Sequence, residues 1–300
     1  MFHYETRTRQ CGRERAGGRD KRRPVAHPHH TAWACTVADN PRMPSALRLL
    51  AIETSTDTLS VALGTGAPDG PLWQHTGPGG AMASTTLLPL VQQLLDASGW
   101  PLASLDAVVF GRGPGSFTGL RTACAVAQGL AYGAQDAARP GGLPVLPVDT
   151  LLALAEEARH AHALTGQPAP DTVVSLLDAR MGELYLALYA CTAAGLSALA
   201  PPRLCAPRDL ATHLDGLLPA GRALLAGNVF ATYDLELAGL RGLRCPALPT
   251  ASALLRLAPA LIAEGGALAA RDALPLYVRD KVAQTTNERE RQRVAAGTVH

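Results

Sequence analysis

Glycine is concentrated in one short string of the chain, Gly111-Arg-Gly-Pro-Gly-Ser-Phe-Thr-Gly-Leu-Arg121. The apolar run at 106–110 predicts a buried strand before it, and the small and apolar residues at 117–133 predict a helix after it. Glycines in such a loop leave backbone N–H groups free at the positive end of the helix, where anions bind. The string therefore restricts the chain to folds in which a strand passes through a tight turn into a helix.

The spacing within this string matches no standard phosphate or nucleophile motif. A Walker A loop needs a lysine directly after Gly119, and a dinucleotide fingerprint needs a glycine where Thr118 stands. Ser116 directly follows Gly115, which excludes the Gly-x-Ser-x-Gly elbow. Two interpretations remain open. The spacing favours a structural turn whose helix is N-capped by Ser116 or Thr118 over a cradle for a ligand.

The apolar periodicity of the remaining chain predicts strands and helices in two similar halves. In the first half it predicts strands at 47–52, 59–63, 71–74, 106–110 and 144–148 and helices at 84–98, 117–133 and 151–163. In the second half it predicts a hairpin from 172–177 and 184–189, a strand at 223–226, a helix at 252–264 and a short segment at 275–278. A chain of 300 residues, 47% of them apolar, is long enough for an α/β protein of two lobes.

The charge of the chain is unevenly distributed. Residues 1–42 carry nine basic and four acidic side chains and no apolar period, and we expect them to form a disordered basic extension. The remaining residues carry 18 basic and 21 acidic side chains, which is unlike a nucleic-acid-binding domain.

Three features of the sequence concern its location. The six cysteines include no Cys-x-x-Cys pair, and the sequence shows no membrane-spanning run and no secretory signal. Together these features predict a cytoplasmic protein.

Few polar residues outside the glycine-rich string are candidates for chemistry. Glu53 and Asp57 lie in the first strand–turn–strand, where the spacing favours turn chemistry over a metal-binding acid. His160 and His162 are two residues apart on a predicted helix, so they cannot share a metal, and we expect both on its solvated surface. The residues predict no catalytic constellation and no metal site.

Five segments, in order along the chain, together resemble one protein family. They are Leu50-Ala-Ile-Glu-Thr-Ser55, the string at 111–121, Pro147-Val-Asp-Thr-Leu151, Asp178-Ala-Arg-Met-Gly-Glu-Leu-Tyr185 and Pro275-Leu-Tyr-Val-Arg279. From about Met43 to Val282 the sequence resembles the TsaB (YeaZ) family. The resemblance implies a two-lobed fold of the actin-like ATPase/RNase H-like (ASKHA) class, each lobe a mixed sheet with flanking helices. We expect lobes at 43–145 and 146–279, the second including the terminal helix, and a polar tail at 280–300.

The resemblance also implies a role in forming threonylcarbamoyladenosine (t6A) at position 37 of tRNA. In that pathway a TsaD-type subunit transfers the threonylcarbamoyl group, and the TsaB-type protein is its non-catalytic partner, with a TsaE-type ATPase joining the complex. The chain is then expected to meet tRNA only through the complex, to form a homodimer when alone and to need no membrane. No intrinsic cofactor is expected, although ATP or ADP shared at the TsaD interface would fit.

Two sets of residues are candidate sites on this interpretation. The loop set is Gly111, Gly113, Pro114, Gly115, Ser116, Phe117, Thr118, Gly119 and Arg121. The helices at 84–98 and 117–133 are apolar or small around most of their circumference, which predicts an extra packing face for a partner. The partner set is Leu87, Leu88, Val91, Leu94, Leu95, Leu120, Ala123 and Ala127.

TsaD-type relatives carry a His-x-x-x-His metal pair after a Pro-Val strand end. Aligned on Pro147-Val148, those positions are Thr150 and Leu154, which are poor ligands, so the resemblance favours a scaffold over a transferase. Two alternatives remain: an actin-fold ATP-dependent enzyme or peptidase acting on its own, and a tRNA-binding module that uses the basic extension.

Overall fold

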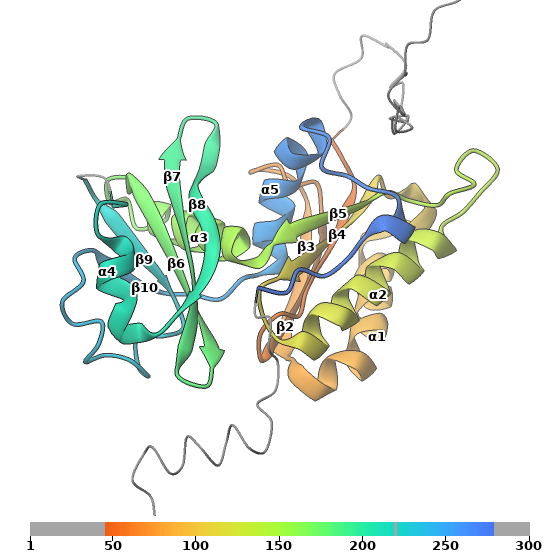
Figure 1. Ribbon diagram of the computed structural model, residues 1–300. Helices are drawn as coiled ribbons and strands as arrows, with labels where there is room; N and C mark the ends of the chain where they lie inside the picture. Colours follow the sequence, from red (N-terminus) through yellow and green to blue (C-terminus); the bar gives the residue numbers. More distant parts are fainter. Residues whose placement is uncertain (1–45, 219–220, 279–300) are drawn as a thin grey trace, which may run out of the picture. The chain divides into compact units, whose positions relative to one another are not determined.

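Residues 46–218 and 221–278 are described by the computed structural model shown in Figure 1. The first sheet contains β1 (Leu49–Glu53), β2 (Thr58–Gly64), β3 (Leu72–Pro78), β4 (Ala107–Gly113) and β5 (Val145–Asp149), in the order β3-β2-β1-β4-β5. The strands β1 to β3 are antiparallel, and β4 and β5 run parallel to β1. The extension expected at 1–42 and the tail expected at 280–300 lie outside the described residues.

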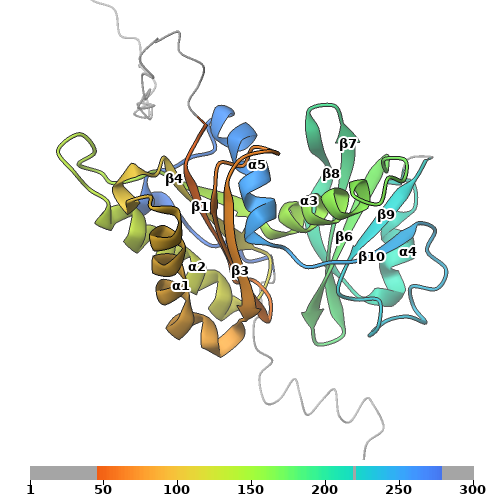
Figure 2. The same ribbon diagram turned by 180° about the vertical axis from the view of Figure 1, so that it is seen from behind.

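The two faces of the first sheet are covered by different helices. Leu50 and Ile52 of β1 pack with α1 (Ala83–Ser98) and α2 (Phe117–Gly133). Leu49 and Ala51 pack with α5 (Ala251–Ala263) on the other face. Figures 1 and 2 show α1 and α2 on one side of the strands and α5 on the other. Alternate strand residues point to opposite faces, so a strand covered twice is apolar throughout.

The second sheet repeats the topology of the first. It contains β6 (Thr172–Arg180), β7 (Glu183–Thr192), β8 (Gly195–Cys205), β9 (Ala223–Gly227) and β10 (Leu243–Pro246). Its order, read from β8, is β8-β7-β6-β9-β10, with antiparallel β6 to β8 and with β9 and β10 parallel to β6. One face is covered by α3 (Thr150–Ala163), and the other packs against α4 (Leu210–Leu214) and residues 229–240. This duplication confirms the two-lobed α/β fold.

Two helices are exchanged between the lobes: each follows a strand of one sheet in the chain but packs on the other sheet. The helix α3 follows β5 of the first sheet but packs on β6, β7 and β9, and α5 follows β10 but packs on β1, β2 and β4. The predicted lobe boundaries are therefore wrong in two places. The strand β5 belongs to the first lobe, so that boundary lies after Asp149, and the terminal helix returns to the first lobe because its apolar face matches the β1 surface.

The order of the predicted elements agrees with the structure. The elements that were not predicted are short or lie at an edge of the second sheet. The helix at 117–133 is reproduced to the residue, and the hairpin at 172–177 and 184–189 extends by a few residues. The edge strand β8, the short strand β10 and α4 escaped prediction. Every helix within the described ranges is too short or too polar to cross a membrane.

Most of the predicted partner set lies in the core of the first lobe. Leu87, Val91, Leu94, Leu95, Leu120, Ala123 and Ala127 are all buried within the described chain, whereas Leu88 is 51% exposed. The prediction that these seven side chains face a partner is wrong: six of them are the stripe that α1 and α2 need against their own sheet, and Leu120 is buried beside Gly113 of the loop. Leu88 was also expected on that stripe and instead points to solvent.

Candidate functional site

The glycine-rich loop packs backbone to backbone against the β1–β2 turn. The N–H of Ser116 donates to the carbonyl of Ser55 at 2.7 Å, and the hydroxyl of Thr54 donates to the carbonyl of Gly119 at 2.7 Å. A Cβ at Gly119 would lie 1.8 Å from the Thr54 carbonyl oxygen, and one at Gly115 would lie 2.6 Å from Ser55. The glycines thus permit a close approach between two backbone segments, which supports the structural interpretation of the loop.

The expected side-chain cap of α2 is absent. Ser116 occupies the N-cap position, but no side-chain hydrogen bond caps the helix there, and Thr118 lies inside the first turn. The backbone bond from Ser116 to Ser55 instead fixes the turn that starts the helix. Gly113 has a φ of 125°, at which glycine is favoured, and a Cβ there would lie 2.4 Å from the Leu276 carbonyl oxygen. The loop is therefore positioned by tertiary contacts from the turn and from the C-terminal segment.

Glu53 ends β1 as a buried carboxylate behind this loop. Its Oε1 accepts a hydrogen bond from the N–H of Ser55 at 2.6 Å, and a Cβ at Gly111 would lie 1.9 Å from Oε2. Burial raises the pKa of Glu53 above its ordinary value, and the hydrogen bonds from Ser55 offset only part of that rise. Asp57, by contrast, is exposed, so the two acids do not form one metal site. The prediction of turn chemistry holds for Glu53.

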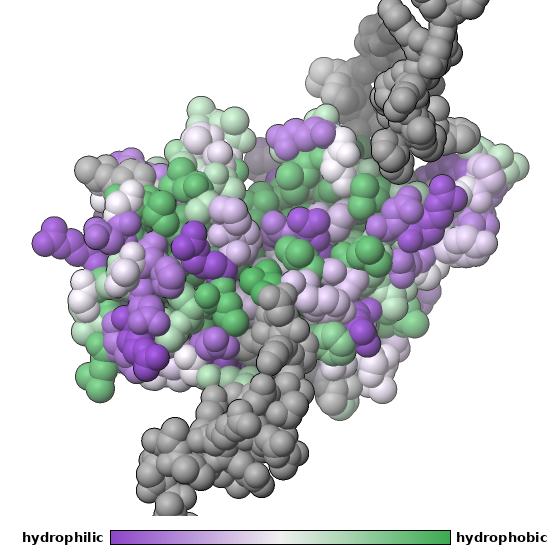
Figure 3. Space-filling view, viewed as in Figure 1, coloured by the Kyte–Doolittle hydropathy of each residue, from purple (hydrophilic) through white to green (hydrophobic). Residues whose placement is uncertain are grey.

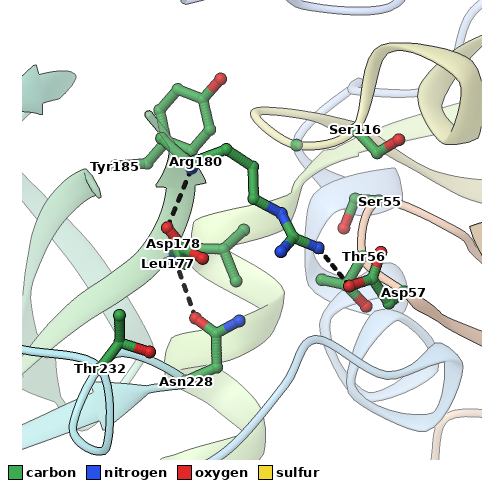
Figure 4. Close-up of a pocket in the computed structure, with 12 residues that line it drawn as sticks. Ser55, Thr56, Asp57, Ser116, Leu177, Asp178, Arg180, Tyr185, Asn228 and Thr232 are labelled. Atoms are coloured by element: carbon green, nitrogen blue, oxygen red, sulfur yellow. Dashed lines mark hydrogen bonds and ion pairs between the residues drawn. The ribbon is translucent and has the colours of Figure 1, made fainter. Parts of the chain in front are cut away.

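A cleft of about 330 Å3 lies between the β1–β2 turn and the β6–β7 hairpin (Figure 4). Twelve residues line it: Ser55, Thr56, Asp57, Gly115, Ser116, Leu177, Asp178, Ala179, Arg180, Tyr185, Asn228 and Thr232. The side chain of Arg180 extends across the cleft and pairs with the carboxylate of Asp57. The cleft is therefore bounded by both lobes, and the ion pair between Arg180 and Asp57 bridges it.

The polar residues of the cleft also hold the hairpin in place. Asn228 accepts a hydrogen bond from the N–H of Asp178 at 2.9 Å, and the Asp178 carboxylate accepts one from the N–H of Arg180 at 2.9 Å. Arg180 and Met181 have φ values of 64° and 59°, in the left-handed region that few non-glycine residues adopt. The hairpin thus holds Arg180 in a constrained backbone conformation at the edge of the cleft.

The actin-like fold class implies a nucleotide in this cleft, and the residues present do not fit a triphosphate. Among the described residues that line the cleft, Arg180 is the one cationic side chain, and it is already paired with Asp57. Asp178 adds a second carboxylate, which repels a phosphate chain. Phosphate sites need several donors and a net positive field, so the cleft lining that the structure describes lacks the charge of an ATP site.

The remaining sequence candidates lie apart from the cleft. Thr150 and Leu154, at the positions of the histidine pair in TsaD-type relatives, are both buried at the start of α3. Within the described ranges, no cluster of three or more His, Cys, Asp and Glu side chains could hold a metal ion. His162 was expected in solvent but is buried, with Nε2 3.0 Å from the Pro168 carbonyl oxygen.

The structure adds two groupings of side chains that sequence reasoning missed. Arg121 and Phe117, both from the loop set, meet Tyr277 of the C-terminal segment. Tyr277 lies in one of the motif segments quoted above, but nothing in its spacing from 117–121 indicated a contact. Likewise, Arg180 and Asp57 come from two separate segments, and only the fold brings them together.

Comparison with known proteins identifies the family. The family model described as "TsaD: tRNA N6-adenosine threonylcarbamoyltransferase" matches residues 82–284. The tRNA threonylcarbamoyladenosine biosynthesis protein TsaB of Escherichia coli K12 is 33% identical over 242 residues, which are 79% of this chain and 96% of that protein. The protein of the same name from Haemophilus influenzae is 31% identical over 249 residues, which are 79% of this chain and 95% of that protein.

A solved structure agrees with this similarity. The structure of YeaZ from Pseudomonas aeruginosa superposes with a TM-score of 0.65 and 33% identity, covering 77% of this chain and 99% of that one. Sequence and fold thus match along nearly the whole length of these relatives, and the chain belongs to the TsaB family.

Proposed function

We propose that this protein takes part in t6A formation on tRNA as the non-catalytic partner of a TsaD-type transferase subunit. The family membership carries the proposal, because the matched relatives are named for t6A biosynthesis. Two observations support the non-catalytic part. The one cation among the described lining residues of the cleft is paired, and buried Thr150 and Leu154 stand at the positions of the metal-binding histidines of TsaD-type relatives. No observation favours an independent ATP-dependent enzyme or peptidase.

The partner surface that we propose is the outer face of α1 and α2. These helices contact each other on one side of the first sheet, and their exposed positions include Leu88 on α1 and Ala125, Gly129 and Tyr132 on α2. Nothing lies within 4 Å of a Cβ placed at Gly129, so a partner helix has room to approach there. Three further predictions stay untested: that a TsaE-type ATPase joins the complex, that ATP or ADP is held at the interface, and that tRNA is bound through the complex.

A binding experiment tests this surface. Ala125→Glu places a charge on the exposed face of α2, and we expect it to weaken binding to the TsaD-type subunit of the same organism about thirtyfold, measured by titration calorimetry. Ala211→Glu, on the exposed face of α4, is the matched control and should bind as the unaltered chain does. Ala127→Glu lies in the core, so it should unfold the first lobe and is unsuitable as a test.

The activity itself is tested by reconstitution. We expect threonylcarbamoyl transfer to tRNA by TsaD- and TsaE-type subunits, ATP and threonylcarbamoyl-AMP to require this protein. The protein alone should neither modify tRNA nor hydrolyse ATP. Full transfer without it would contradict the proposed function, and ATP turnover by the protein alone would contradict the non-catalytic role.

A further inference from the structure

A cationic side chain at the start of α2 is held in place by two aromatic rings. The guanidinium carbon of Arg121 lies 3.9 Å from the centre of the Phe117 ring, and its Nε donates to the Tyr277 hydroxyl at 3.1 Å. The two rings lie 5.2 Å apart, centre to centre. We call these three residues the Arg121 cluster.

The C-terminal strap, residues 270–278, supplies Tyr277 by running along α2. Gln128 donates to the carbonyls of Ala270 and Ala273 at 3.0 and 3.1 Å, and Arg121 then reaches Tyr277. The N–H of Leu276 also donates to the carbonyl of Arg112 at 2.7 Å. Figure 1 shows the strap running alongside α2, so the cluster is fixed by two segments that lie far apart in the sequence.

Arg121 is held in place, but its charge is not ion-paired and part of its hydrogen-bonding capacity is unused within the described chain. No ion pair joins Arg121 to any residue in the described part of the chain, unlike Arg112, Arg180 and Arg256. The hydrogen bond to Tyr277 uses Nε, which leaves the end formed by the two Nη groups for another acceptor. A guanidinium held by a ring and a hydroxyl in this way has lost rotamer entropy before binding, so a planar anion gains more from it than from a mobile side chain.

The surroundings of the cluster favour a protein partner over RNA. Phe117 is 37% exposed, Tyr277 is 41% exposed and Leu274 of the strap is 71% exposed. Figure 3 shows hydrophobic and hydrophilic side chains side by side on the face that carries α2 and the strap. Aromatic residues and arginine beside exposed aliphatic residues are typical of the centres of protein interfaces. RNA binding instead needs several cations, and residues 43–300 carry more acids than bases.

We propose that the Arg121 cluster receives a carboxylate side chain of the TsaD-type subunit, in a proposal that rests on the function proposed above. The carboxylate accepts hydrogen bonds from the two Nη groups, while the partner's aliphatic atoms cover Leu274 and the edges of Phe117 and Tyr277. The site lies at the N-terminal end of the outer face of α2. It therefore adds a charged, directional contact to a face whose other exposed positions are mainly small.

Variants of Arg121 test this contact in the full chain with the TsaD-type subunit. We expect Arg121→Ala to weaken the complex about thirtyfold and Arg121→Lys about tenfold, because lysine keeps the charge but not the planar fork. Tyr277→Phe keeps the ring and removes the acceptor of the Nε hydrogen bond, so it should weaken the complex about threefold. Raising NaCl from roughly 50 to 500 mM should weaken the unaltered complex more than the Arg121→Ala complex. Arg208→Ala, at a position on the second lobe where the side chain is 82% exposed, is the control.

The outcomes separate this inference from the function on which it rests. If the unaltered chain fails to bind the TsaD-type subunit, the proposed function is wrong. If the unaltered chain binds and Arg121→Ala binds within twofold of it, the Arg121 inference alone is wrong. Two further outcomes would also overturn the inference. If Arg121→Ala loses tRNA binding while partner binding is unchanged, the site binds a phosphate. If Arg121→Ala loses the homodimer, measured by sedimentation, while partner binding is unchanged, the site binds a second copy of the chain. Melting temperatures of the variants, expected within a few degrees of the unaltered chain, show that each is folded.

Discussion

Two glycines of α2 have opposite roles, although both lie in one helix. Gly119 touches the Thr54 carbonyl, so a Cβ there collides with backbone, whereas Gly129 faces open space. We expect Gly119→Ala to lower the free energy of unfolding by about 2–4 kcal/mol and Gly129→Ala to raise it by about 0.5–1 kcal/mol, since alanine favours a helix interior. Urea denaturation of both variants measures the difference. Equal effects would mean that the loop does not depend on the close approach.

The buried carboxyl of Glu53 makes stability depend on pH. Because burial raises its pKa in the folded state above 4.5, the folded chain binds this proton more tightly than the unfolded chain does. Stability contributed by the protonated form is therefore present below the unfolded pKa and is lost as pH rises through the folded pKa. The glutamine in Glu53→Gln cannot titrate. The free energy of unfolding of this variant should therefore rise relative to that of the unaltered chain as the pH is raised from about 4 to about 8.

Urea unfolding across that pH range measures the gain. Glu264→Gln, at an exposed position on the C-cap of α5, is the matched control. Parallel stability curves for Glu53→Gln and the unaltered chain would show that the buried carboxyl does not change its proton affinity on folding.

At the scale of elements, an ion-pair network joins α3 to α5. The buried Glu156 lies 2.9 Å from Arg159 and 3.0 Å from Arg256, and Arg256 also pairs with Glu157 at 2.6 Å. Arg256→Met keeps the aliphatic stem and removes the cation shared by the two acids. We expect it to lower the free energy of unfolding by about 1–3 kcal/mol, because Glu156 loses one of its two partners in a buried setting.

An exposed arginine is the control for this network. The pair between Arg208 and Asp209 is 3.8 Å long and largely exposed, so Arg208→Met should change stability by less than about 0.5 kcal/mol. Thermal denaturation compares the two variants. Equal shifts would show that the burial of Glu156 adds nothing to the attachment of α5.

At the scale of the whole molecule, the two lobes are tied by exchanged helices more than by the ion pair across the cleft. In that pair the side chains of Arg180 and Asp57 are 68% and 79% exposed, and exposed pairs contribute little. We expect Asp57→Asn to lower stability by less than about 1 kcal/mol, an effect that vanishes at high salt. A loss above about 2 kcal/mol, measured by urea denaturation at low salt, would show that the cleft pair holds the lobes together.

The order of elements could be predicted because it depends on local patterns. Apolar residues form a continuous short run in β1 and recur every three to four positions in α2, and glycines mark the loop between β4 and α2. The strands β8 and β10 escaped prediction because an edge strand is half exposed and lacks a continuous apolar period. The motif segments were also visible without coordinates, and similarity to TsaB proteins confirmed the family that they indicated.

Periodicity shows that a side chain is buried but not which surface buries it. The stripe of Leu87 and Val91 was therefore assigned to a partner, although its own sheet covers it, and α5 was placed in the wrong lobe. The same limit applies to the site. Sequence alone determined the elements, the glycine-rich loop and the family, because these depend on neighbouring residues. Only the tertiary structure joined Arg121 to Tyr277 and Asp57 to Arg180, because these contacts span more than a hundred residues of chain and depend on how the sheets and helices pack.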